Sequence, residues 1–112
     1  MDRTTQYHAL IRTLLQNMAE LYGGDSPSLQ TELVFDEEHG HYHLGEVGWE
    51  GDQRIDGVLI HIDLIGEKIW IQRNWTETRV AEELVKMGVP RDKIVLGFKH
   101  PSMRPDTEYA AA

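Results

Sequence analysis

Side chains that could bind a metal ion gather in one short stretch of the sequence. His39, His41 and His43 lie there among acidic residues, namely Asp36, Glu37, Glu38 and Glu46. Side chains two residues apart on a strand point to the same face, and neutral imidazoles beside a carboxylate can hold zinc or another divalent ion. The His41 and His43 pair supplies only two ligands, so a third would have to come from His61 or Asp63 across the sheet. We therefore expect exposed polar residues on a solvent-facing strand, with no metal and no cofactor.

His61 and Asp63 share one face of the strand that is otherwise the most apolar in the chain. A carboxylate that orients an imidazole is the arrangement of an acid–base pair, but a hydrogen-bonded polar face has the same pattern. No serine, threonine or cysteine is placed as an obvious nucleophile, and no glycine-rich phosphate loop is present. The sequence favours a structural or partner-contact role for the pair. A small metal-dependent or His/Asp-based hydrolase stays open as the alternative.

Three tryptophans are many for a domain of this size. We expect Trp49 and Trp70 to lie in the core. Trp75 precedes a predicted helix and should be at least partly exposed, and tryptophan is favoured at protein interfaces because it buries a large area at low cost in side-chain entropy.

The second half of the sequence contains a basic segment with a single acidic residue, Asp92. Its five cations are Lys86, Arg91, Lys93, Lys99 and Arg104. This segment is the one candidate for a phosphate-facing patch. A solvated edge that limits strand aggregation is the favoured interpretation.

Apolar spacing predicts the elements that must position these residues. A one-faced pattern of apolar residues predicts a helix from about residue 4 to 22, and alternation predicts strands over residues 29–36, 41–49, 55–65 and 68–73. A turn is expected over residues 25–28. The apolar parity changes across Gly45-Glu46, which indicates a β-bulge in the second strand. Asn74 and Glu77 have the spacing of a capping box for a second helix that ends before Gly88, and residues 93–98 predict a last strand.

This order predicts an α+β fold in one domain over residues 1–112. The expected architecture is an antiparallel meander of about four strands plus a C-terminal strand, with two helices packed on one face, in the order α-β-β-β-β-α-β. Pro101 and Pro105 argue against a helix or a central strand across residues 100–106.

Charge and composition argue against several classes of function. The 112 residues contain no cysteine, which removes disulfides, thiolate metal sites and thiol catalysis. Eleven Lys and Arg against 19 Asp and Glu give a net charge of −8, and the excess of acid lies in residues 1–56. Such a chain repels nucleic acid, so direct specific DNA binding is not expected. No apolar run is long enough to cross a membrane and no targeting segment is evident, so we expect a cytoplasmic protein.

Short strings along nearly the whole chain are similar to one known family. They are Val47-Gly48-Trp49, residues 57–63, residues 68–72, Thr76-Glu77, residues 83–85, Gly88-Val89-Pro90, residues 94–98 and residues 107–110. In their order and spacing they resemble the XisI family, the cyanobacterial fdxN element excision controlling factors. The string from His61 to Gln72 is the most specific part. The chain departs from the family pattern at Val58, where a cysteine is common, and at Trp75, where a smaller residue is common.

The resemblance implies a small accessory protein for the programmed excision of a DNA element that interrupts a nitrogen-fixation gene during heterocyst differentiation. In that system a recombinase cuts and joins DNA, and XisI-like and XisH-like proteins act as controlling factors. The implied partners are an XisH-like protein or the site-specific recombinase, and a homo-oligomer stays open. The resemblance supplies no catalytic residue, so we expect no enzyme. The candidate partner-binding or polar cluster comprises His61, Asp63, Trp75 and Arg104.

Overall fold

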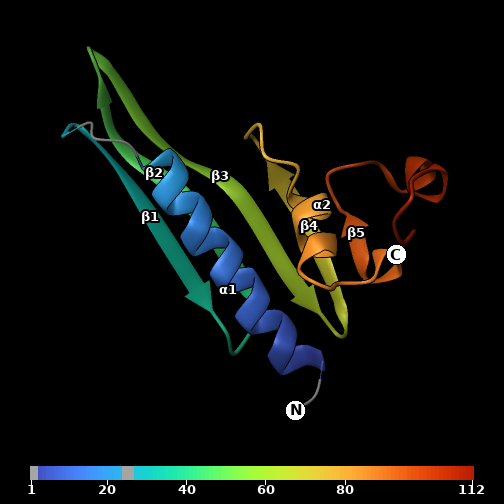
Figure 1. Ribbon diagram of the computed structural model, residues 1–112. Helices are drawn as coiled ribbons and strands as arrows, with labels where there is room; N and C mark the ends of the chain where they lie inside the picture. The colour runs from blue at the N-terminus through green and yellow to red at the C-terminus, as the bar shows by residue number, and fades with distance from the viewer. Residues whose placement is uncertain (1–2, 24–26) are drawn as a thin grey trace.

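The computed structural model describes residues 3–23 and 27–112. Figure 1 shows the elements in the expected order of a helix, four strands, a helix and a strand. They are α1 (Arg3–Tyr22), β1 (Leu29–Asp36), β2 (His41–Glu50), β3 (Gln53–Ile65), β4 (Lys68–Asn74), α2 (Val80–Lys86), the 3-10 helix η1 (Arg91–Lys93), β5 (Ile94–Leu96) and the 3-10 helix η2 (Pro101–Asp106). The predicted α+β fold is confirmed. The first part of the turn expected over residues 25–28 lies outside the described residues.

The five strands form one mixed sheet in the order β1-β2-β3-β4-β5. The first four strands are antiparallel neighbours joined by short turns, and β5 pairs with β4 in parallel. Gly40 and Gly66 occupy two of the turns with φ of 75° and 63°, which glycine adopts without steric cost. A parallel pair needs a crossover, and α2 lies in the connection between β4 and β5.

Both helices lie on the same face of the sheet, as predicted (Figure 1). α1 crosses β1, β2 and β3, while α2 packs beside it over β4. α1 buries Tyr7, Ile11, Leu14, Leu15 and Met18 against alternate sheet residues, which are Tyr42, Leu44, Ile60, Ile62, Leu64, Ile69 and Ile71. The residues between them therefore point to the opposite side, which we call the helix-free face. Within the described residues, neither α-helix is long and apolar enough to span a membrane.

The predicted β-bulge lies in β3 and not in β2. The β2–β3 register passes from Leu44 opposite Ile60 to Gly45 opposite Val58, so Leu59 is the extra residue. β2 keeps its phase along β1, and Trp49 therefore continues the row of His41 on the helix-free face. Its exposed fraction is 50%, so the prediction that Trp49 lies in the core is wrong.

Trp70 is only partly buried, and it does not belong to the core between helices and sheet. It stands opposite Asp63 in the β3–β4 register, on the helix-free face. The sequence-based assignment of Trp70 to the core is therefore wrong as well. Alternation alone shows that two residues share a face, but it does not show which face the helices cover.

Asn74 does not cap α2, contrary to the predicted capping box. The helix begins later, after Arg79, and has no side-chain cap. Asn74 Oδ1 instead accepts hydrogen bonds from the backbone N–H and the hydroxyl of Thr76, and its Nδ2 donates to the Thr78 carbonyl 2.8 Å away. Asparagine side chains that bond to nearby backbone stabilise turns in competition with helix, and here the turn wins.

The C-terminal region also differs from expectation. β5 covers only Ile94–Leu96, and residues 101–106 form η2 although they contain two prolines. Pro101 stands in the first turn of η2, where a backbone N–H is not needed, and His100 accepts a hydrogen bond from the Ser102 N–H as the N-cap. The prediction that the prolines exclude helix across residues 100–106 is therefore wrong.

Candidate functional site

Three histidines and one aspartate form a cluster on the helix-free face. The β2–β3 register places His41 opposite Asp63 and His43 opposite His61. Asp63 Oδ1 accepts hydrogen bonds from His41 Nδ1 and from His61 Nε2, both at 2.8 Å. The ring centres of His43 and His61 are 4.4 Å apart in an edge-to-face arrangement. These four residues are called the His–Asp cluster below.

A bulge in β4 completes the surroundings of Asp63. The β3–β4 register passes from His61 opposite Arg73 to Ile62 opposite Ile71, which leaves Gln72 as the extra residue. Gln72 Nε2 donates to Asp63 Oδ2 at 3.1 Å. Both oxygens of the carboxylate are therefore engaged, and only 13% of the Asp63 side chain is exposed.

The pKa values of two residues of the cluster, Asp63 and His43, are lowered. Burial raises the pKa of Asp63, but the hydrogen bonds from His41, His61 and Gln72 together outweigh burial and hold this pKa below its ordinary value. Burial lowers the pKa of His43, and the charge of the neighbouring His61 lowers it further. Asp63 therefore stays ionised, while His43 favours its neutral form.

The sequence prediction that His61 and Asp63 share a polar face is confirmed, and the structure adds His41 to them. Arg104 belongs to the same surface through Trp70, because its guanidinium carbon lies 5.0 Å from the centre of the Trp70 ring. Arg104 also donates hydrogen bonds to the carbonyls of Lys99 and Gly97, at 3.1 and 3.3 Å. The C-terminal segment is thus fixed beside the cluster.

Trp75 connects to the cluster through Arg73. The guanidinium carbon of Arg73 lies 4.3 Å from the centre of the Trp75 ring, and Arg73 stands opposite His61 in the register. Trp75 is 70% exposed, as its position before α2 predicted. Its backbone N–H donates to the Leu59 carbonyl beyond the last β3–β4 pair, so the indole lies where the two strands separate. Arg104 and Trp75 thus reach the cluster through Trp70 and Arg73. Trp75 also borders hollows lined by Glu46 and Leu59.

Sequence reasoning missed Gln72 and Arg73. Alternation along β4 places Gln72 on the same side as Trp70, which is the face of Asp63, and it places Arg73 on the opposite side. The extra residue in the register is a property of the strand pair, and no pattern within β4 alone reveals it. The one sequence signal for this bulge is that three polar residues follow Ile71 in a row, which breaks the alternation of apolar and polar residues.

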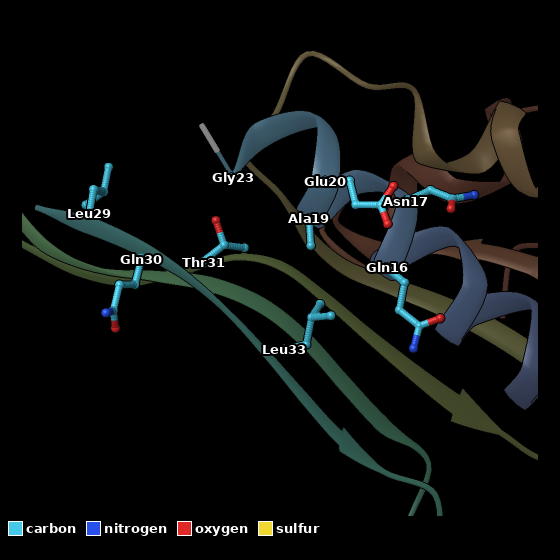
Figure 2. A pocket seen from close by; sticks show the side chains of 9 residues that line it. All are labelled: Gln16, Asn17, Ala19, Glu20, Gly23, Leu29, Gln30, Thr31 and Leu33. Atoms are coloured by element: carbon cyan, nitrogen blue, oxygen red, sulfur yellow. The ribbon is translucent and has the colours of Figure 1, made fainter. Parts of the chain in front are cut away.

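A groove lies between α1 and β1, away from the cluster (Figure 2). Gln16, Asn17 and Glu20 border it from the helix, and Thr31 and Leu33 border it from the strand. Among these residues Glu20 alone has a charge, and no histidine lines the groove. This groove lacks the groups that metal binding or acid–base chemistry requires.

Most cations of the basic segment contact carboxylates or backbone carbonyls of the same chain. Three of its cations contact acidic side chains in the described chain: Lys86 with Glu83 at 3.4 Å, Arg91 with Glu108 at 3.2 Å, and Lys93 with Glu67 at 3.9 Å. Arg104 is bonded to backbone as described above. The positive charge of the segment is therefore largely balanced within the protein.

Comparison with known proteins identifies relatives of the whole chain. The family model described as XisI protein matches residues 1–111. A XisI-like protein from Anabaena variabilis ATCC 29413, known from a crystal structure, is 42% identical and superposes with a TM-score of 0.91 over 97% of this chain and 99% of its own.

A second crystal structure from the same organism is that of the fdxN element excision controlling factor XisI. It is 30% identical, with a TM-score of 0.86 over 99% of this chain and 100% of its own. No curated protein matches the chain. The match to the family model and the two crystal structures agree over almost every residue, and the chain therefore belongs to the XisI family.

Proposed function

We propose that this protein is a non-enzymatic accessory factor that controls the site-specific excision of a DNA element by acting through a protein partner. One observation carries the proposal, namely the likeness over the full chain to a protein named as the fdxN element excision controlling factor. The proposed partner is an XisH-like protein or the recombinase itself. Excision needs a protein that cuts and joins DNA, and a controlling factor can act on that protein without contacting DNA.

The charge distribution supports action through a partner. The protein has a net charge of −8, and three of the five cations in its basic segment already contact carboxylates. Affinity for DNA arises largely when basic side chains displace counterions from phosphates, and cations paired within the protein contribute little to that exchange. An acidic surface is instead complementary to a basic protein that handles DNA.

Asp63 is engaged within the His–Asp cluster, so this carboxylate is not placed to act as a general base. A general base must present a free lone pair to the proton that it removes. Asp63 accepts hydrogen bonds at both oxygens, two at Oδ1 and one at Oδ2. The carboxylate therefore orients the imidazoles and Gln72 instead of facing a substrate.

We propose that Trp75 becomes buried when the partner binds. Its side chain is 70% exposed, and the Arg73 guanidinium packs on one face of the ring. Arg73 is itself bonded to the Val58 carbonyl at 3.4 Å, which limits the freedom of both side chains. Exposed tryptophan and arginine held in place are typical of residues that dominate binding energy.

Co-purification and gel-shift assays test the proposal together. The purified protein should not retard element-border DNA relative to scrambled DNA at physiological salt, and it should bind an XisH-like protein or the recombinase. Trp75→Ser should weaken that complex at least tenfold. Ile65→Ser is the matched control, because Ile65 is 54% exposed at the other end of β3.

Two results would contradict the proposal. Tight binding of the isolated protein to border DNA over scrambled DNA would show that it contacts DNA directly. Equal loss of partner binding in Trp75→Ser and Ile65→Ser would remove Trp75 from the interface. Excision assays with the recombinase, with the original protein, with Trp75→Ser and without either, would then show whether excision is controlled without the Trp75 contact.

A further inference from the structure

We propose that His41, His61 and Asp63 bind one divalent transition-metal ion per chain, with the ligand preference of zinc. From the sequence, His41 and His43 were the paired ligands, and a third would have to come from His61 or Asp63 across the sheet. The structure instead brings His41 together with both His61 and Asp63, and the Asp63 carboxylate accepts a hydrogen bond from each of the two imidazoles. This inference concerns the His–Asp cluster alone and does not depend on the proposed role in excision.

The donor atoms of the three residues converge on one point. They lie within 4.8 Å of one another, and Asp63 Oδ1 is 2.8 Å from a nitrogen of each imidazole. Ligands bound at about 2.1 Å to one tetrahedral ion stand about 3.4 Å apart. The donor atoms are thus close to binding distances, and the His41 side chain, which is 54% exposed and already bonds to Asp63, can turn to complete the site.

Neighbouring groups hold two of the three ligands in place. Gln72 donates to Asp63 Oδ2, the oxygen that the ion would not use, and hydrogen bonds of this kind orient ligands in metal sites. The His43 ring packs edge-on against His61 at a centre distance of 4.4 Å. His61 and Asp63 also stand two residues apart on the same strand, so their spacing is fixed by the backbone. His41 is the most exposed of the three ligands and has the most room to adjust.

The donor set selects the class of ion. Two imidazole nitrogens with one carboxylate oxygen suit zinc and other first-row transition metals, and magnesium and calcium prefer oxygen ligands. The cluster lies on the helix-free face and each ligand is at least partly accessible, so an ion and a completing water molecule can reach it. Three protein ligands leave room for that additional ligand.

Metal binding would link β2 to β3 near the hairpin that joins β1 to β2. Asp36 stands opposite His41 on β1, so the site lies close to the first hairpin. An ion bound only by the folded protein stabilises it by mass action. The expected consequence is a rise of the melting temperature with zinc, and no such rise with magnesium.

The test uses the purified full chain, treated with chelator and then dialysed against ZnCl2. Metal analysis should give one zinc per chain, and isothermal titration should show that Asp63→Asn, His61→Gln and His41→Gln each weaken binding at least tenfold. His39→Ala and His100→Ala remove histidines outside the site and should bind zinc like the original protein. His41→Gln replaces an exposed side chain, so it keeps the test decisive if Asp63→Asn does not fold.

Nuclear magnetic resonance of the imidazole nitrogens adds a second readout. Zinc should shift Nδ1 of His41 and Nε2 of His61, the two nitrogens that face Asp63. The proposal is overturned if the original protein binds no more zinc than Asp63→Asn. It is also overturned if His39→Ala abolishes binding as strongly as His41→Gln does, because the ion would then bind at the Asp36 and His39 hairpin.

Discussion

The Arg104 guanidinium lies over the Trp70 ring, with its carbon 5.0 Å from the ring centre, and it thereby joins the C-terminal segment to β4. The same guanidinium donates to the Lys99 and Gly97 carbonyls. Arg104 lies in η2, and both carbonyls belong to the loop that precedes η2 in the chain. A single side chain thus links η2, the preceding loop and the sheet.

Loss of Arg104 should therefore destabilise the protein. Arg104→Ala removes two hydrogen bonds from a charged donor and a cation–π contact, which together should lower the free energy of unfolding by about 1–3 kcal/mol. Urea denaturation measures this change. Arg79→Ala is the control, because Arg79 is 78% exposed and its contact with Glu82 is a surface pair. Equal stability of Arg104→Ala and the original protein would show that the C-terminal segment is held by other contacts.

The sequence predicts α1 and the four antiparallel strands well, for a physical reason. Apolar residues at helical spacing or in alternation indicate one buried face, and α1 buries five of the residues that this spacing selects. The same rule placed His61 and Asp63 together. Periodicity within a strand therefore carries both the fold and the centre of the candidate site.

The rest depends on relationships between strands, which periodicity does not record. The extra residues Leu59 and Gln72 belong to registers between two strands, and they decide that Trp49 leaves the core and that Arg73 stands opposite His61. Asn74 shows a different limit. Its side chain can cap a helix or close a turn with the same chemistry, and the tertiary position of α2 decides between them.

Substitution at Leu14 should show that α1 is part of the core. Leu14 is 5% exposed, so Leu14→Asp places a charge without a partner between helix and sheet and should unfold the protein or lower its free energy of unfolding by about 4 kcal/mol or more. Leu21→Asp on the same helix is the control, because Leu21 is 71% exposed. Thermal denaturation followed by circular dichroism separates the two. Similar melting temperatures for both variants would mean that α1 does not pack as described.

Gly48 should tolerate no side chain, whereas Gly57 should. Gly48 has a φ of 149°, and a Cβ atom there would lie 2.0 Å from the Ser28 carbonyl oxygen. Gly48→Ala should therefore cost about 2 kcal/mol or more, from backbone strain and displacement of β1. At Gly57 a Cβ atom would meet nothing within 4 Å, so Gly57→Ala should be neutral or slightly stabilising. Urea denaturation of both variants checks the contrast, and a stable Gly48→Ala protein would contradict the β1–β2 geometry.

Asp36 should titrate below its ordinary pKa of 3.8, because the His39 side chain and then the His39 backbone N–H donate hydrogen bonds to its carboxylate. A lowered pKa in the folded state means that the interaction stabilises the protein above pH 3.8 and is lost as the pH falls through the lowered value. Carbon-detected magnetic resonance of the Asp36 carboxyl group measures this pKa.

His39→Ala is the informative variant for the same titration. It removes the imidazole hydrogen bond and keeps the backbone N–H, so the pKa of Asp36 should rise toward 3.8 without reaching it. His100→Ala should leave this pKa unchanged, because His100 caps η2 in another part of the protein. An unchanged pKa of Asp36 in His39→Ala would show that the imidazole does not bond to the carboxylate in solution.

Association with the proposed basic partner should slow as salt rises. Opposite charges accelerate encounter, and salt screens them over about 8 Å at 0.15 M and about 3 Å at 1 M, so the association rate should fall at least tenfold over that range while dissociation changes less. Glu50→Gln should also slow association, because Glu50 is exposed in the acidic half of the chain. Asp106→Asn makes the same change of charge in the half where acids and bases balance, and it should have a smaller effect. Stopped-flow or surface-based kinetics with the XisH-like protein or recombinase measure these rates, and an association rate independent of salt would show that the net charge of −8 does not guide the encounter.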